Sequence, residues 1–333
     1  MVQTTGLLRF YPAIYPQAAV GFVLRCFYMD RVEPVGLEQA IVRTVAWFSL
    51  FDYPLTGFEI WCWLYAPGQK FTLSDVEKVL AESSWLPGRV CQSDGFFVLG
   101  GRNPKDFIKL RQTKFLDAAR KFKKLRQAAK FFSLFPFVRA VFACNNLSWH
   151  NTTPESDIDL FIVVSPGTIW LSRFLLVTPF RLLGRRPKQT KIDPFCFSFF
   201  TTQNNLFLEK LLLSESDPYM YYWLASLVPI FDRGEIQNQL MQKNKWAFDF
   251  LPNSFFETTG AEEIGFVSFN FLKFFEKAVK RLQEKLLPLS IKTAANLDSR
   301  VIVSDVMLKF HLNDRRAHFR EEWKKLYEAY GAG

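Results

Sequence analysis

Two aspartates carry the clearest chemical signal in this sequence. Asp157 and Asp159 stand two positions apart and open an apolar run, residues 160–164. On a β-strand, residues two apart project from the same face, so both carboxylates would point toward one place. Mg²⁺ prefers such hard oxygen ligands and keeps positions open for substrate phosphates. The spacing therefore predicts that Asp157 and Asp159 bind Mg²⁺, although a pair of surface acids at a strand end would show the same pattern.

The segment before these aspartates adds a second feature. Residues 137–144 form another apolar run, which predicts a buried strand. Asn145 and Asn146 follow it directly, and residues 147–156 then lead to Asp157. This order resembles the signature of the DNA polymerase beta superfamily of nucleotidyltransferases, in which a strand ends in Gly-Ser and Asp-hydrophobic-Asp-hydrophobic follows. Asn145 and Asn146 occupy the Gly-Ser position.

The resemblance implies a reaction, the transfer of a nucleoside monophosphate from a nucleoside triphosphate to a hydroxyl of an acceptor that it does not identify. Two metal ions in such a site activate the attacking hydroxyl and stabilise the leaving pyrophosphate. Asn145 and Asn146 would hold the phosphates. Asparagine is the non-glycine residue that best tolerates a left-handed turn, and its amide donates hydrogen bonds.

The superfamily completes its metal site with a third carboxylate from a neighbouring strand. Asp193 is the candidate here, because it precedes an aromatic run at 195–201 that predicts a third strand. Pro194 beside it indicates the entry or edge of that strand. We therefore expect Asp157, Asp159 and Asp193 as catalytic carboxylates, with Asp157 and Asp159 as the metal ligands.

The altered Gly-Ser pair keeps a second hypothesis open. A transferase domain that has degenerated would leave a nucleic-acid-binding or regulatory protein, so the sequence decides neither for nor against an enzyme. A formal net charge of +10 favours polyanionic partners such as nucleic acid only weakly.

The chain from about 37 to 330 is also similar to a bacterial family in which a winged-helix-like segment precedes the nucleotidyltransferase domain and a helical region follows it. The stretches that carry this similarity are residues 51–56, 136–139 and 308–311. This similarity implies a fold and a metal site but no particular substrate.

Residues 37–103 predict the winged-helix-like domain. Apolar residues at helical spacing predict helices over 39–51 and 73–82, the second of which begins at a Thr-x-x-Asp capping box. Two short apolar runs within 89–99, joined by Ser-Asp-Gly, predict a hairpin. The presumed recognition helix, 73–82, has more acidic than basic residues and is a poor surface for phosphates, so we expect an architectural role.

Residues 104–135 predict a basic connecting helix. Its lysines and arginines could track phosphates, but charge runs are usually solvated, and we favour a solvated connecting helix. The basic residues of this helix are Lys105, Lys109, Arg111, Lys114, Arg120, Lys121, Lys123, Lys124, Arg126 and Lys130.

Residues 136–204, in the order strand, loop, strand, helix, strand, predict a small mixed-sheet nucleotidyltransferase domain of the α/β (α+β) class. The apolar segment 169–183 within it contains arginines and a proline, which favours a buried helix over a membrane span. Beyond it the pattern predicts a helical C-terminal region, 205–333, with one strand or extended stretch at 301–310.

The remaining polar residues have weaker signals. No pair among His150, His311 and His318 has metal-ligand spacing. His311 heads a polar cluster that ends at Arg316, which could reach a bound nucleotide, but a helix cap at Asn313 or Asp314 would explain the same residues.

The five cysteines are odd in number and form no CxxC pair, which argues against a disulfide framework and a zinc site and favours a reducing cytoplasm. Residues 1–36 lack the features of a secretory signal and form an extension that the sequence does not explain.

Overall fold

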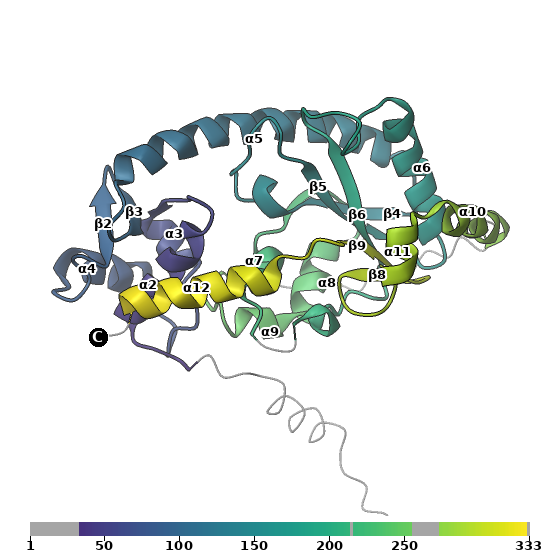
Figure 1. Ribbon diagram of the computed structural model, residues 1–333. Helices are drawn as coiled ribbons and strands as arrows, with labels where there is room; N and C mark the ends of the chain where they lie inside the picture. The colour runs from purple at the N-terminus through teal and green to yellow at the C-terminus, as the bar shows by residue number, and fades with distance from the viewer. Residues whose placement is uncertain (1–32, 214–215, 255–272, 332–333) are drawn as a thin grey trace, which may run out of the picture.

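The computed structural model describes residues 33–213, 216–254 and 273–331. It shows the expected mixed α/β class, with one sheet of three strands and one of six. Figure 1 shows the long helix α5 running from the small sheet at one end to the large sheet at the other. In the described part of the chain, no helix is long and apolar enough to cross a membrane.

The small sheet and its helices occupy the N-terminal third of the described chain. Strand order is β1-β3-β2, and both pairings are antiparallel. Thr72 and Asp75 form the capping box that the sequence predicts, and Thr56 and Glu59 form another. The elements are α2 (Leu37–Ser49), β1 (Leu55–Thr56), α3 (Gly57–Cys62), α4 (Leu73–Glu82), β2 (Val90–Ser93) and β3 (Phe96–Leu99).

The connecting helix α5 (Pro104–Phe132) is less solvated than its charge pattern suggests. Arg111 forms an ion pair with Glu59 at 2.7 Å, and Lys121 is completely buried. Long basic side chains therefore fasten this helix to α3 and to the segment before β6 (Phe195–Thr202). Within the described chain, the basic residues of α5 that stay exposed and form no ion pair are Lys105, Lys109, Lys123, Arg126 and Lys130.

The large sheet has the order β7-β4-β5-β6-β9-β8. Only β5 and β6 are parallel; the other neighbours are antiparallel. β8 and β9 lie within the strand or extended stretch predicted at 301–310, whereas β7 comes from a part expected to be helical. All three strands join the large sheet, so the sheet extends past the predicted boundary at residue 204. Pro229 in β7 cannot donate a ladder hydrogen bond and is tolerated because β7 is an edge strand. The strands are β4 (Val138–Ala143), β5 (Ile158–Val164), β6 (Phe195–Thr202), β7 (Val228–Asp232), β8 (Val301–Val303) and β9 (Met307–Phe310).

Each face of the large sheet has its own core. Alternate residues of a strand point to opposite faces, so Phe142 belongs to one core and Val141 to the other. The first core also contains residues of α2, α7 and α12, and the second contains residues of α5 and α6. The remaining elements are α6 (Ile169–Leu182), α7 (Pro218–Ala225), α8 (Ile236–Lys243), α9 (Lys245–Phe248), α10 (Lys273–Leu286), α11 (Leu289–Ala294), α12 (Arg316–Gly331) and the 3₁₀ turns η1 (Asn145–Leu147) and η2 (Glu209–Leu211).

The first and last described helices, α2 and α12, lie side by side (Figure 1). Trp323 donates its indole N–H to the carbonyl of Arg43 at 3.0 Å, and its ring meets Trp47 edge-on. One continuous core therefore joins the predicted winged-helix-like domain to the C-terminal region. Of the predicted extension 1–36, residues 1–32 lie outside the described residues.

Candidate active site

The turn after β4 takes the conformation that its sequence position requires. Asn145 has a φ of 56°, in the left-handed region that glycine adopts freely and asparagine tolerates. Its side-chain amide donates a hydrogen bond to the carboxylate of Asp159, and its Oδ1 accepts one from the Tyr219 hydroxyl at 3.1 Å. Asn146, the next residue, is exposed. The turn thus places Asn145 directly beside the start of β5.

The two aspartates of the sequence signature come together at the start of β5. Asp157, Asp159 and Cys196 form the cluster of potential metal ligands in the described part of the chain, and their ligand atoms lie within 4.8 Å of one another. All three residues are half-buried. Cys196 enters the cluster because β6 runs parallel to β5 with Cys196 opposite Asp159.

The electrostatics of this cluster favour the uptake of positive charge. Burial and the neighbouring Asp159 raise the pKa of Asp157 to about 6, against a smaller opposite effect of Lys121. Burial also raises the pKa of Asp159, although hydrogen bonds from Asn145 and Cys196 oppose the shift. Two carboxylates this close repel each other when both are ionised. A divalent cation or a proton between them removes that repulsion.

Cys196 fits a metal less well than the aspartates do. Burial and the charge of Asp159 raise the pKa of its thiol well above the usual value, and the thiol donates a hydrogen bond to Asp159. A protonated thiol is not a metal ligand, and Mg²⁺ prefers oxygen. The donor set that fits Mg²⁺ is therefore Asp157 and Asp159, with the remaining positions left for phosphate oxygens or water.

Asp193, the expected third carboxylate, lies outside this cluster. It is 3% exposed, and its carboxylate forms ion pairs with Arg120, Lys121 and Lys124 of α5, the one to Lys121 at 2.9 Å. Burial raises its pKa, but these three cations outweigh burial and hold the pKa of Asp193 well below its usual range. The neighbouring strand thus presents a thiol, Cys196, beside Asp159, while the carboxylate of Asp193 binds the connecting helix.

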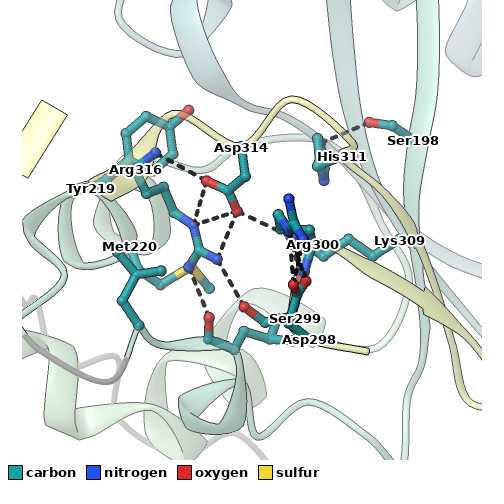
Figure 2. A network of polar contacts seen from close by, with 12 residues as sticks. Ser198, Tyr219, Met220, Asp298, Ser299, Arg300, Lys309, His311, Asp314 and Arg316 are labelled. Carbon is teal, nitrogen blue, oxygen red and sulfur yellow. Dashed lines mark hydrogen bonds and ion pairs between the residues drawn. The ribbon is translucent and has the colours of Figure 1, made fainter. Parts of the chain in front are cut away.

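A hollow of about 250 Å³ opens next to Asn145 on the side of the C-terminal segment. Figure 2 shows the polar network around it, with Arg316 bound to Asp314 and His311 directed toward Ser198. Asp314 lies two positions before α12 begins and accepts a hydrogen bond from the backbone N–H of Arg316 at 3.0 Å, so it binds the start of the helix from outside the N-cap position. The same cluster also lines the hollow.

The basic residues that line this hollow differ in how freely they can bind an anionic ligand. Arg316 is buried in ion pairs with Asp217 and Asp314. Burial and the charge of Arg316 lower the pKa of Lys309 to about 8. Arg315 is exposed, and its guanidinium lies over the ring of Phe319, with Cζ 4.9 Å from the ring centroid. Arg315 is therefore the cation of this lining best placed to meet an anionic ligand.

The histidines play smaller parts. Burial lowers the pKa of His311 to about 3, so this side chain is neutral, and its Nε2 lies 3.1 Å from the Ser198 hydroxyl. His150 packs between Phe115 and Phe122 of α5, away from the carboxylates. His318 is exposed on α12.

A second, aromatic hollow shares Asn145, Tyr219 and Trp223 with the first. The sequence did not predict it, because its residues are scattered over the chain and meet only when α2 packs on the large sheet. The heavy aromatic content was its one signal. Its lining consists of Trp47, Phe48, Phe51, Tyr53, Asn145, Asn146, Trp149, Asn151, Tyr219, Tyr222 and Trp223.

No family model matches this chain, and neither a curated protein nor a solved structure matches it. Its function must therefore be inferred from the site and the fold.

Proposed function

We propose that this protein binds a magnesium–nucleoside triphosphate complex and transfers the nucleoside monophosphate to a hydroxyl of an acceptor. The observation that carries the proposal is the convergence of Asp157 and Asp159 at the start of β5, beside the left-handed turn at Asn145. The resemblance in sequence to the DNA polymerase beta superfamily supports it. The strand, turn, strand, helix, strand order over residues 138–202 supports a nucleotidyltransferase domain.

The residues divide the work by their chemistry. Asp157 and Asp159 would hold Mg²⁺, which polarises the phosphates and, as a pair of ions, activates the acceptor hydroxyl. Asn146 is exposed and can donate its amide to a phosphate oxygen, whereas the amide of Asn145 is already bound to Asp159. Arg315 offers a bidentate guanidinium to the triphosphate.

The parts around this domain support an accessory role. The order α2, β1, α3, α4, β2, β3, with the sheet order β1-β3-β2, supports a winged-helix-like module. Its shared core with α12 supports an architectural function for that module. The free thiols Cys62, Cys91, Cys144 and Cys196 support a cytoplasmic location.

One observation favours the second function, a degenerate transferase that binds nucleic acid or regulates a partner. Cys196 stands beside Asp159, where the superfamily pattern would place a third carboxylate. A protein with two metal ligands and a protonated thiol can bind a metal–nucleotide complex without transferring the nucleotide. The exposed basic residues of α5 would then supply the phosphate-binding surface.

Release of pyrophosphate from each of the four common nucleoside triphosphates, with and without Mg²⁺, tests the first function. We expect magnesium-dependent release that the double variant Asp157→Asn, Asp159→Asn abolishes. Glu321→Gln with Glu322→Gln on α12 is the matched control, because it removes the same charge from residues that belong neither to the carboxylate cluster nor to the lining of either hollow. Nucleotide binding without release in the parent, and release after Cys196→Asp, would establish the second function instead.

A further inference from the structure

The two hollows that meet at Asn145 differ in chemistry. The aromatic hollow has rings and three neutral amides in its lining and no charged residue, whereas the larger one contains Lys309, Asp314 and Arg315. Their volumes are about 40 Å³ and about 250 Å³. The smaller hollow admits the leading edge of one flat ring, and the larger one admits a hydrated anionic group. A ligand that fills both is planar and uncharged at one end and anionic at the other.

Asn151 gives the aromatic hollow a specific polar atom. Its Nδ2 donates to the backbone carbonyl of Phe51 at 3.1 Å, and because a carbonyl only accepts, this bond fixes which way the amide points. The Oδ1 atom is buried without a hydrogen-bond partner among the described residues, and Asn151 is 7% exposed. An unpaired buried acceptor is unfavourable, so a ligand that donates an N–H there gains affinity.

The rim of the hollow suits a flat ring. Phe51, Trp149 and Tyr219 of the lining are half-buried, whereas Trp47 and Tyr222 are buried. Stacking on aromatic side chains stabilises the binding of any base, whereas a hydrogen bond to the base edge distinguishes one base from another.

We propose that the aromatic hollow binds the nucleobase of the donor nucleotide, and that Asn151 Oδ1 accepts a hydrogen bond from the exocyclic amino group of adenine or cytosine. In these two bases the amino group is the N–H donor of the base edge, which matches a single free acceptor. Guanine presents more donors than this one atom can satisfy, and uracil presents its one N–H between two carbonyl oxygens, which would face the Asn151 Oδ1 acceptor without a donor. The inference rests on the proposed function and names the substrate class of the same site.

Free nucleosides without metal test the inference, because Trp47, Trp149 and Trp223 line the hollow and report binding by quenching of their fluorescence. Adenosine is compared with purine riboside, and cytidine with its 4-deamino analogue, since the members of each pair differ in the amino group. We expect saturable quenching by adenosine or cytidine and roughly tenfold weaker binding of its deamino partner.

Asn151→Leu should remove this preference. Asn253→Leu is a matched control, because Asn253 also donates its Nδ2 to a carbonyl, that of Trp61, and has an unpaired Oδ1, but lies outside the lining. The absence of quenching by every nucleoside, equal binding of both members of each pair, or an unchanged preference in Asn151→Leu would overturn the inference. If Asn151→Leu does not fold, the two nucleoside pairs decide alone.

This test separates the two proposals. It uses neither metal nor triphosphate, so nucleoside binding in a protein that releases no pyrophosphate would refute the transfer reaction alone. Pyrophosphate release in a protein that fails to bind these nucleosides would refute the base pocket alone.

Discussion

Asp193 and the pair Asp157–Asp159 lie around the same buried cation, Lys121, and yet their surroundings are opposite. Asp193 meets three cations of α5, which outweigh burial and lower its pKa. Asp157 and Asp159 are compensated more weakly: the charge of Lys121 acts on both, and hydrogen bonds from Asn145 and Cys196 act on Asp159, but burial outweighs them and the pKa of each is raised. One carboxylate is fully compensated by the protein, and the other two are not.

This difference separates a structural carboxylate from candidate ligands. A carboxylate whose charge is neutralised by ion pairs stabilises the fold, and its oxygens are already occupied and do not bind a metal. Uncompensated carboxylates that face one another cost stability in the free protein, and such perturbed groups cluster at functional sites. In the sequence, all three aspartates stand at or just before the start of a strand, and this pattern does not distinguish them. The charged groups around each carboxylate in the folded protein do.

Removal of Asp193 should have the largest effect on stability. Asp193→Asn leaves the buried Lys121 with only its longer ion pair, to Asp117 at 3.7 Å, and loss of one partner of a buried ion pair costs about 3 kcal/mol of unfolding free energy. Asp157→Asn should cost nothing or stabilise the metal-free protein, because it relieves repulsion with Asp159. Urea unfolding of both variants at pH 7.5 without metal measures the contrast, and equal losses in the two variants would contradict it.

The pH dependence of stability should reveal the uncompensated pair. A carboxyl whose folded pKa is raised stabilises the fold below its unfolded pKa and loses that contribution as the pH rises through the folded value. The Asp157 contribution, on the order of 1 kcal/mol after allowance for solvent screening, should therefore disappear between about pH 4 and about 6. The Asp193 contribution has the opposite sign. Because the pKa of Asp193 is lowered in the folded protein, its stabilising contribution is present at neutral pH and is lost only as the pH falls into strong acid.

Mg²⁺ should restore the unfolding free energy that ionisation of Asp157 and Asp159 removes. Above pH 6, Mg²⁺ at ten times its dissociation constant should add about 1.4 kcal/mol to the unfolding free energy, because it binds the folded state alone. Urea titrations from pH 4 to 8 with and without Mg²⁺ measure both effects. The double variant Asp157→Asn, Asp159→Asn should lose the pH effect in this window and the response to Mg²⁺, and a persistent response would place the metal elsewhere.

Local patterns predict the elements that carry the site. The capping box at Thr72, the length of α5 and the strands that flank Asn145 depend on residues close in sequence, and the structure reproduces each of them. The approach of Asp157 and Asp159 follows from the two-residue period of a strand. These parts of the candidate site need no knowledge of distant contacts.

Distant contacts decide the rest. Asp193 binds residues about seventy positions earlier in the chain, and its ion pairs become visible only when α5 is placed against β6. Cys196 reaches Asp159 through the parallel register of β5 and β6, which a bulge shifts beyond Asp159. The aromatic hollow joins α2 to α7, β7 comes from a region expected to be helical, and the predicted stretch 301–310 pairs with β6, which is about a hundred positions earlier. No local pattern contains this information.

Replacement of Asn145 and Asn146 by Gly and Ser should have the smallest effect and tests whether the turn still works. Left-handed strain costs about 1 to 2 kcal/mol in an ordinary residue and less in asparagine, so glycine recovers little. It also removes the hydrogen bond that Asn145 donates to Asp159, which should raise the pKa of Asp159 further. A serine contact to phosphate adds on the order of 1 kcal/mol, or roughly fivefold in affinity.

These effects oppose one another, so we expect the magnesium–nucleotide affinity of Asn145→Gly, Asn146→Ser to stay within about tenfold of the parent at pH 8. At a lower pH the affinity of the variant should fall further below that of the parent, because the loss of the Asn145 hydrogen bond raises the pKa of Asp159 and favours its protonated form. Lys188→Gly, which relieves an exposed left-handed residue with a φ of 70°, is the control for strain alone. Calorimetric titration at both pH values measures the difference. If binding is undetectable in the parent and restored in the double variant, the natural turn no longer binds the nucleotide. The second proposed function, a degenerate transferase with a regulatory or nucleic-acid-binding role, would then replace the first.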